Sequence, residues 1–137
     1  MASSRLKRLF AISIAVFIAH GLEELFTDFY SVDRHYHALF SPFENLPVYK
    51  ATFLLFNLMM WLWLITSLLL ITHPKWQLRL AFLPMLLYIF ELHHLLDIAH
   101  VKGYTPGAVT GLAFPLLAVL YGRQWLKDVV TPQTRAD

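Results

Sequence analysis

The stretch Leu9–Thr27, with the sequence LFAISIAVFIAHGLEELFT, decides the fold class because it can cross a lipid bilayer as one helix. A hydrocarbon core of about 30 Å requires about 20 predominantly apolar residues in a helix. Three further stretches have the same character, and they are Tyr49–Thr72, Leu78–Ala99 and Pro106–Leu126. We therefore predict an all-α polytopic membrane protein in which residues 1–137 form one domain, a four-transmembrane-helix up-down bundle.

The basic residues predict the orientation of these helices. Of the eleven Lys and Arg residues, eight flank one side of the four spans, and Arg34, Lys50 and Lys102 flank the other. Because positive charge is retained on the cytoplasmic side, we expect both termini in the cytoplasm and the segment 28–48 outside. That segment is rich in aromatic residues, so we expect it to lie in the outer headgroup layer, where it can act as a lid.

Composition excludes several classes of protein. Hydrophobic residues make up 58% of the chain, above the roughly 45–50% of soluble domains, which indicates that lipid is its solvent and its expected partner. The chain has no cysteine, so disulfides and thiolate sites are excluded and a metal ion must be held by His, Asp or Glu. A net charge of +2 without a basic block gives no support for a nucleic-acid partner.

Ionisable residues inside two predicted spans are the strongest functional signal. His20, Glu23 and Glu24 share one face of the first span, and Glu91 and His94 are stacked neighbours on the third. At about 1.5 Å per residue, both groups lie about 18–24 Å from the basic residues at the inner boundary, and therefore at one depth. A charged carboxyl at the bilayer centre costs about 2.5–3.5 kcal/mol, so these glutamates must be paired, protonated or bound to a cation.

Three interpretations of this cluster stay open. A divalent ion, which would be Fe, Mn or Zn, satisfies several carboxylates at once and keeps the histidines neutral, and is the simplest physical account. A hydrogen-bonded network that holds the first and third spans in register is the structural alternative. The third is a proton or ion pathway without a fixed metal.

Further polar residues are expected to support the cluster. Four of them lie on the second, third and fourth spans near its depth, and they are Asn57, His93, Asp97 and Thr110. We expect them to contact the ligands, and His93 and Asp97 are also candidates for direct binding. The sequence leaves open whether the loop and rim histidines join the site, namely His35, His37 and His100.

The stretch His20-Gly-Leu-Glu23-Glu24 resembles the signature of the HxxEE-motif family of small bacterial integral membrane proteins and matches its defining motif in full. The likeness extends to His94 and to Tyr104-Thr-Pro-Gly-Ala-Val-Thr110, which is similar to the family's Tyr-Ser/Thr-Pro-Gly-x-Val-Thr segment. Both motifs stand in the right order and together cover essentially the whole chain. The resemblance implies polar motifs that form an active site or metal site, with no established reaction.

The residue types are compatible with two kinds of metal chemistry. Two histidines and three carboxylates are the donors of di-iron or di-manganese centres, and Glu91-x-x-His94 has the spacing used in carboxylate-bridged bundles. A single zinc ion held by His20, His94 and one glutamate, with a spare glutamate as general base, is equally compatible. The predicted metal ligands are His20, Glu23, Glu24, Glu91 and His94, of which the three glutamates are also the catalytic candidates.

The sequence therefore predicts a metal-dependent membrane enzyme of unassigned reaction. Its substrate should be a lipid-soluble or amphiphilic small molecule that enters between helices, because the chain has no large soluble domain to bind a polar one. Two rivals remain, a small proton- or ion-linked membrane carrier and a structural membrane subunit.

Overall fold

The computed structural model describes residues 1–43, 45, 48–73 and 77–131, and every regular element within these ranges is a helix. The longest elements are α1 (Ser4–Phe26) and α4 (Tyr49–Ile71). The others are α2 (Phe29–Val32), α3 (Arg34–Phe40), η1 (Ser41–Phe43), α5 (Gln77–Leu80), α6 (Leu83–Phe90), α7 (His93–Val101), α8 (Ala108–Gly111) and α9 (Ala113–Val130). The predicted all-α class is confirmed for the described part of the chain.

Three helical segments are long and apolar enough to cross a membrane, and they are Ser4–Phe26, Tyr49–Ile71 and Gln77–Val101. They correspond to the first three predicted spans. The fourth predicted span, 106–126, is not confirmed as a crossing. Its chain is divided at Leu112 into α8 and α9, and the 18 residues of α9 include Arg123, Lys127 and Asp128.

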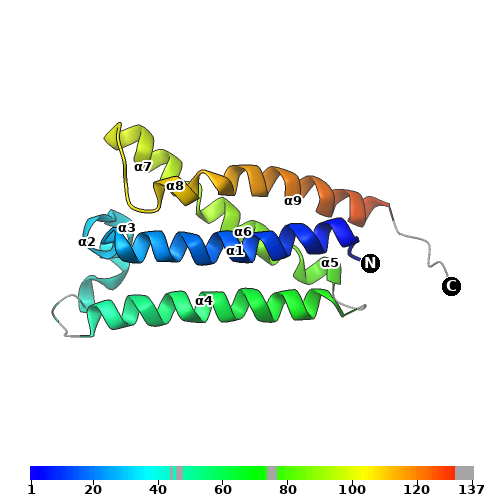
Figure 1. Cartoon of the computed structure of the whole chain (residues 1–137), viewed down its shortest axis with the longest axis horizontal. Coiled ribbons are helices and arrows are strands. Elements are labelled where there is room, and N and C mark those ends of the chain that lie inside the picture. The colour runs from blue at the N-terminus through cyan, green and yellow to red at the C-terminus, as the bar shows by residue number, and fades with distance from the viewer. Residues whose placement is uncertain (44, 46–47, 74–76, 132–137) are drawn as a thin grey trace.

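The helices lie along a common long axis with α1 in the middle, α4 on one side and α9 on the other (Figure 1). α6 packs against α9, and α5 contacts both α4 and α9. The break between α5 and α6 precedes Pro84, which lies in the first turn of α6, where a proline needs no N–H partner. The start of α1 and the end of α9 therefore lie at the same end of the molecule (Figure 1).

Aromatic side chains fill the space between α1, α6 and α9. The ring of Phe17 lies 5.8 Å from Tyr88 and 4.6 Å from Phe114, measured between centroids, and all three residues are fully buried. The ring of His20 meets Phe114 edge-on at 5.0 Å. Because well-packed rings have few alternative rotamers, this aromatic layer is a firm support for His20.

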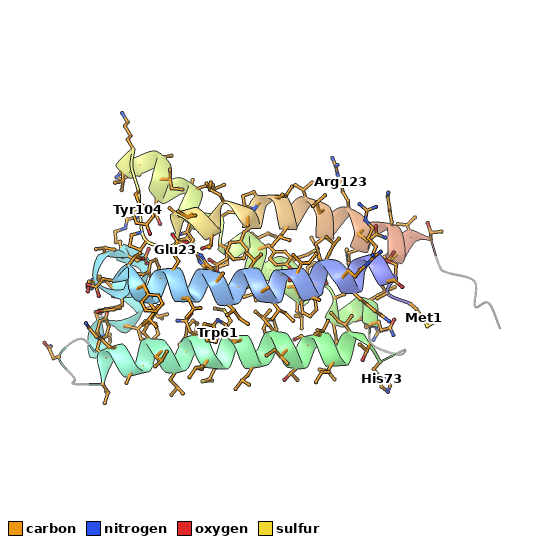
Figure 2. All side chains as sticks on the ribbon, in the orientation of Figure 1. Met1, Glu23, Trp61, His73, Tyr104 and Arg123 are labelled. Atoms are coloured by element: carbon orange, nitrogen blue, oxygen red, sulfur yellow. The ribbon has the colours of Figure 1, made fainter. Side chains whose placement is uncertain are left out.

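One face of α4 carries apolar side chains away from the other helices, as Figure 2 shows. Leu55, Met59, Leu62 and Leu69 are each between 58% and 65% exposed, and their spacing places them along one side of the helix. A continuous exposed apolar stripe of this length is suited to contact with lipid.

The segment after α1 is a packed cap. Asp28 has φ +62°, the left-handed conformation that turns the chain sharply at the end of α1. Phe29 and Tyr30 are then buried against Phe53 of α4, with ring centroids 6.2 and 6.0 Å apart. In its described part, the predicted outer segment 28–48 thus forms α2, α3 and η1 at one end of α1 and α4 (Figure 1). Its movement as a lid stays a prediction.

Candidate metal centre

Four buried side chains meet between α1 and the junction of α6 and α7. His20 and Glu24 are one turn apart on α1 and so point to the same side of that helix. Glu91 ends α6, and His94 lies in the first turn of α7. Each of the four is at most 7% exposed. The structure therefore brings together four of the five predicted ligands.

Imidazole nitrogens and carboxylate oxygens alternate in this cluster. His20 Nε2 lies 3.3 Å from Glu24 Oε1 and 3.1 Å from Glu91 Oε2. His94 Nε2 lies 3.5 Å from each of the same two oxygens. Ligand atoms bound to one ion at about 2.1 Å are separated by about 3.0–3.5 Å. The four separations fall within this range. His20, Glu24 and His94 form one group with metal-ligand spacing, and Glu91 forms another with His93 and His94.

His94 provides an independent test of whether these residues could hold a metal. It is fully buried, yet neither of its ring nitrogens has a hydrogen-bond partner within the described part of the chain. A buried polar atom without a partner costs about 1–3 kcal/mol. Because Nε2 faces two carboxylate oxygens at 3.5 Å, an ion between them would satisfy it. The buried His and Glu residues could therefore hold a metal ion.

Hydrogen bonding at the other nitrogen of His20 determines which tautomer is present. Nδ1 lies 2.8 Å from Thr110 Oγ1, and that hydroxyl donates to Glu23 Oε2 at 2.5 Å. A hydroxyl has one proton to donate, so Thr110 must accept the bond from Nδ1–H. His20 Nε2 lies at hydrogen-bond distance from Glu91 Oε2, 3.1 Å, and donates to that carboxylate when it carries a proton. If an ion took the place of this proton, the Nε2 lone pair would face the cluster, which is the form of histidine that binds metals.

The Glu23 carboxylate, predicted as a ligand, points to the N-terminal turn of α8. It accepts hydrogen bonds from the backbone N–H groups of Val109 at 3.0 Å and Thr110 at 2.8 Å. The Tyr104 hydroxyl donates to it at 3.0 Å, and the two side chains lie next to each other in Figure 2. Among the described residues, Glu23 belongs to no group with metal-ligand spacing. Glu23 thus orients Thr110, and Thr110 orients His20.

The turn before α8 packs directly on the two imidazole rings. Gly107 has φ +78°, and a Cβ atom at this position would lie 2.7 Å from His94 Cε1 and 2.8 Å from His20 Cε1. At Gly111 a Cβ atom would lie 3.1 Å from the Cβ of His94. The two glycines therefore allow the backbone to close the cluster on the α8 side.

A cavity of about 170 Å³ reaches the two carboxylates of the cluster from the side of the cap. Its wall is mainly apolar, and the apolar residues are Phe29, Leu39, Phe40, Phe56, Met60, Leu87 and Phe90. Asn57 also lines it, is 3% exposed, and has an Oδ1 atom with no partner among the described residues. The cavity thus joins an apolar space to Glu24, Glu91 and one amide.

The remaining predicted residues lie around the cluster. Thr110 contacts His20 directly, whereas His93 and Asp97 lie with Asp33 in a separate group whose ligand atoms are within 4.8 Å of one another. His93 also lies within that spacing of Glu91 and His94.

The loop and rim histidines lie apart from the cluster. His37 Nε2 is hydrogen-bonded to the Ser31 carbonyl at 2.9 Å, and His100 is exposed on the wall of an outer pocket. The side chain of His35 lies outside the described part of the structure.

The site unites two sequence motifs, the helical His20–Glu24 segment and the Tyr104–Thr110 turn. A family of proteins of unknown function, defined by an HXXEE motif, matches residues 11–121. The chain belongs to this HXXEE family. No curated protein and no solved structure matches it. In this family member, the motif's histidine and second glutamate face the cluster, while the first glutamate binds the second motif.

Tyr104 contacts Glu23, and Gly107 packs on the two imidazole rings, but neither was among the predicted site residues. Partial burial and the neighbouring Glu23 carboxylate raise the pKa of Tyr104. Their signal was present in Tyr104-Thr-Pro-Gly107, where proline and glycine indicate a turn. The contact itself could not be predicted locally, because Tyr104 and Glu23 are 81 residues apart in the chain.

Proposed function

We propose that this HXXEE protein is a membrane-embedded metal-dependent enzyme with one divalent ion held by His20, Glu24, Glu91 and His94. The observation that carries the proposal is the convergence of two imidazoles and two carboxylates, all buried, at 3.1–3.5 Å. Two carboxylates balance the charge of a divalent ion, and this neutralisation offsets the cost of burying them.

The donor set favours one ion over two. Dinuclear carboxylate centres in helical bundles use four glutamates and two histidines. Here Glu24 and Glu91 face the histidines, whereas Glu23 is bound to the N–H groups of α8. A single ion is accordingly the arrangement that the described residues support best, and we infer hydrolysis rather than oxidation by a dinuclear centre.

In a hydrolytic reaction, the side chains of the site would have separate roles. A bound ion would supply Lewis acidity toward a substrate carbonyl or a water molecule. Glu24 Oε1 and Glu91 Oε2 face the histidines, and both side chains line the cavity, so the second oxygen of either carboxylate could accept a proton from a water molecule there. Glu23 acts as a positioning residue, since its bond to Thr110 keeps the proton of His20 on Nδ1.

The cavity indicates the class of substrate. Its wall is mainly apolar, and its polar lining residues are Glu24, Asp33, Asn57, Glu91 and His93. A space of about 170 Å³ accommodates part of a lipid-soluble molecule rather than a large polar one. We infer an ester or amide of an apolar compound, with its polar bond next to the two glutamates.

The proposed topology completes the bundle with a fourth crossing. α8 and α9 return alongside α1 and α6 toward the end of the molecule where the chain begins (Figure 1). The basic residues Arg5, Arg8, Arg79, Arg123 and Lys127 lie in the helices near that same end. The positive-inside rule then supports a cytoplasmic location for both termini.

Metal analysis of detergent-purified protein tests the proposal. We expect about one tightly held divalent ion per chain, a sharp loss in Glu24→Gln, and little change in His100→Ala, which removes an exposed histidine outside the cluster. Glutamine keeps the shape of Glu24 but removes the charge that balances the ion. If neither the parent nor Glu24→Gln contains metal, and both unfold at the same temperature, the cluster is a structural hydrogen-bonded network and the enzyme proposal fails.

A proton- or ion-linked carrier is the second candidate, and one observation favours it. The inner cavity and a larger outer pocket share Phe29 and Asp33, so titratable groups follow one another from the outer pocket to Glu91. In liposomes, pH-dependent flux by metal-free protein would support the carrier, whereas the enzyme requires retained metal and no flux.

A further inference from the structure

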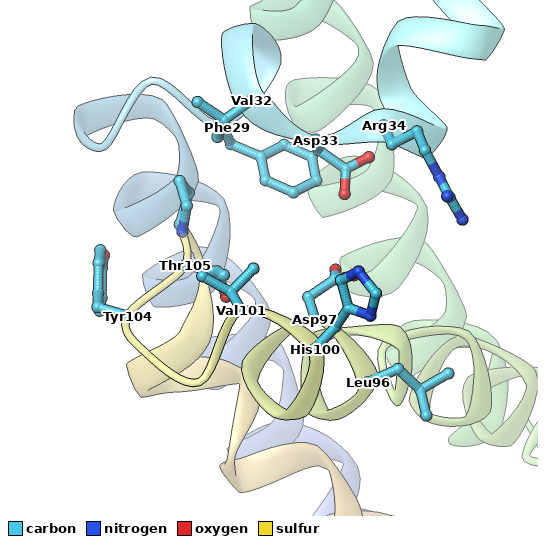
Figure 3. Close-up of a pocket in the computed structure, with 11 residues that line it drawn as sticks. Phe29, Val32, Asp33, Arg34, Leu96, Asp97, His100, Val101, Tyr104 and Thr105 are labelled. Carbon is cyan, nitrogen blue, oxygen red and sulfur yellow. The ribbon is translucent and has the colours of Figure 1, made fainter.

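A second cluster of metal-ligand side chains lies between the outer pocket, which Asp33 and Asp97 line, and the inner cavity, which Asp33 and His93 line. The pocket has a volume of about 570 Å³ and is enclosed by α2, the start of α3, α7 and residues 104–106. Figure 3 shows Asp33, between α2 and α3, facing Asp97 and His100 of α7 across it. The pocket therefore places acidic and imidazole groups from two separate elements opposite each other.

Asp33, His93 and Asp97 are close enough to bind one ion. Each offers one ligand atom, and these atoms lie within 4.8 Å of one another. His93 and Asp97 are one turn apart on α7, so both side chains point to the same side of that helix. Asp33 is 7% exposed, and its backbone N–H donates to the Phe29 carbonyl at 2.9 Å. The three ligands are thus positioned by ordered backbone.

The ring of His93 is oriented by a backbone carbonyl. Its Nδ1 is hydrogen-bonded to the oxygen of Phe90 at 3.0 Å, and only a protonated Nδ1 can donate to a carbonyl. In the neutral ring, Nε2 is then the nitrogen with the lone pair. A backbone carbonyl at one ring nitrogen is the usual means by which proteins orient the other nitrogen toward a metal.

We propose that Asp33, His93 and Asp97 bind a second divalent cation, of the Mn²⁺ or Zn²⁺ class, at the wall of the outer pocket. Two carboxylates balance its charge, and one imidazole with two carboxylates is a ligand set that such ions accept. Three protein ligands leave further coordination positions to water from the pocket. This site binds more weakly than the centre, because it has fewer protein ligands and His93 and Asp97 are only half-buried.

Other charged and titratable residues also line the outer pocket. Arg34 lines the pocket and is exposed. His100 lines the pocket and is exposed as well. Asp33 and Asp97 belong to neither of the ligand groups that contain His94, whereas His93 also lies within ligand spacing of Glu91 and His94. The two sites are therefore neighbours, and Glu24 belongs to the centre alone.

Titration of the purified full chain with Mn²⁺, followed by electron paramagnetic resonance of the free ion, tests this site. We expect a tight class and a weaker class of binding in the parent protein. Asp97→Asn and Asp33→Asn should weaken the weaker class by at least about tenfold, because a neutral amide no longer balances the ion. Asp28→Asn is the matched control, since it removes an exposed carboxylate beside the cap and outside the pocket.

Glu24→Gln separates the two sites. It should abolish the tight class and leave the weaker class at parental affinity. A parent without a weaker class, or Asp97→Asn and Asp33→Asn proteins that bind Mn²⁺ as the parent does, would overturn the second site. Equal weakening by Asp28→Asn would overturn it too. A parent with only the Asp97-dependent class would support this site and contradict the proposed centre.

Discussion

Replacing Gly107 with alanine tests the packing of the turn before α8 on the histidine pair. A residue with a Cβ atom at φ +78° loses about 1–2 kcal/mol relative to glycine. The new methyl group would also lie 2.7 Å from His94 Cε1 and 2.8 Å from His20 Cε1, and such overpacking costs about 1–3 kcal/mol. The free energy of unfolding should therefore fall by about 2–5 kcal/mol.

The change is measured by thermal or denaturant unfolding in detergent, together with metal content. Gly103→Ala is the matched control, because Gly103 lies in the same connection and its φ is not positive. A Cβ atom there would lie 4.0 Å from the Val101 carbonyl oxygen, which is ordinary van der Waals contact. Gly107→Ala should lose stability and metal together, since the rings that must move carry the two imidazole ligands. If Gly107→Ala and Gly103→Ala behave alike in both measurements, the turn does not pack on the cluster and the reasoning is refuted.

Three further predictions concern the surroundings of the cluster. Thr110→Val removes the hydroxyl between His20 and Glu23 and should lower metal affinity by about 10–100-fold. Thr105→Val, whose hydroxyl has no partner among the described residues, should leave metal affinity unchanged. Equal effects of the two substitutions would contradict the orientation of His20 by Thr110 and Glu23. The pKa of Tyr104 is raised, so the stability that its protonated form contributes is present below pH about 10 and lost as pH rises through the raised pKa. Above that pH the unfolding temperature of the parent should fall more steeply than that of Tyr104→Phe. Parallel curves of unfolding temperature against pH would contradict a contribution from Tyr104. Single cysteines at Ala38 and His73, in a chain without native cysteine, should label from outside only at position 38, and labelling of position 73 in intact cells would reject the topology.

The sequence predicted the helical segments well because their signal is local. Length and apolar content predict α4 to within one residue, and α1 to within one residue at its end and five at its start. Helical spacing places His20 beside Glu24 and Glu91 beside His94. The fourth segment was harder to predict, because the break at Leu112 follows from how α8 packs on the cluster.

The different hydrogen-bond partners of Glu23 and Glu24 could not be predicted from their spacing along the helix. Both lie within one turn of His20 on nearly the same face, so an isolated helix does not distinguish them. The distinction arises from the N–H groups of Val109 and Thr110, 86 and 87 residues further along the chain, which bind one carboxylate and leave the other to the histidines. Contacts over such distances in sequence depend on how the helices pack.

The packing of residues 28–43 also could not be predicted from the local sequence. Their aromatic content predicted a location near the headgroups, whereas the short helices α2, α3 and η1 follow from burial of Phe29 and Tyr30 against Phe53. That packing also forms part of the wall of the cavity beside Glu24 and Glu91.

X-ray absorption at the metal edge of the purified, dialysed protein tests the central claim most directly. One ion held by His20, Glu24, Glu91 and His94 predicts light-atom ligands at about 2.0–2.2 Å and outer-shell scattering from two imidazole rings. His94→Gln should reduce the imidazole signal by about half if the ion is retained. A metal signal without imidazole scattering, or dialysed protein with no metal at all, would contradict the account.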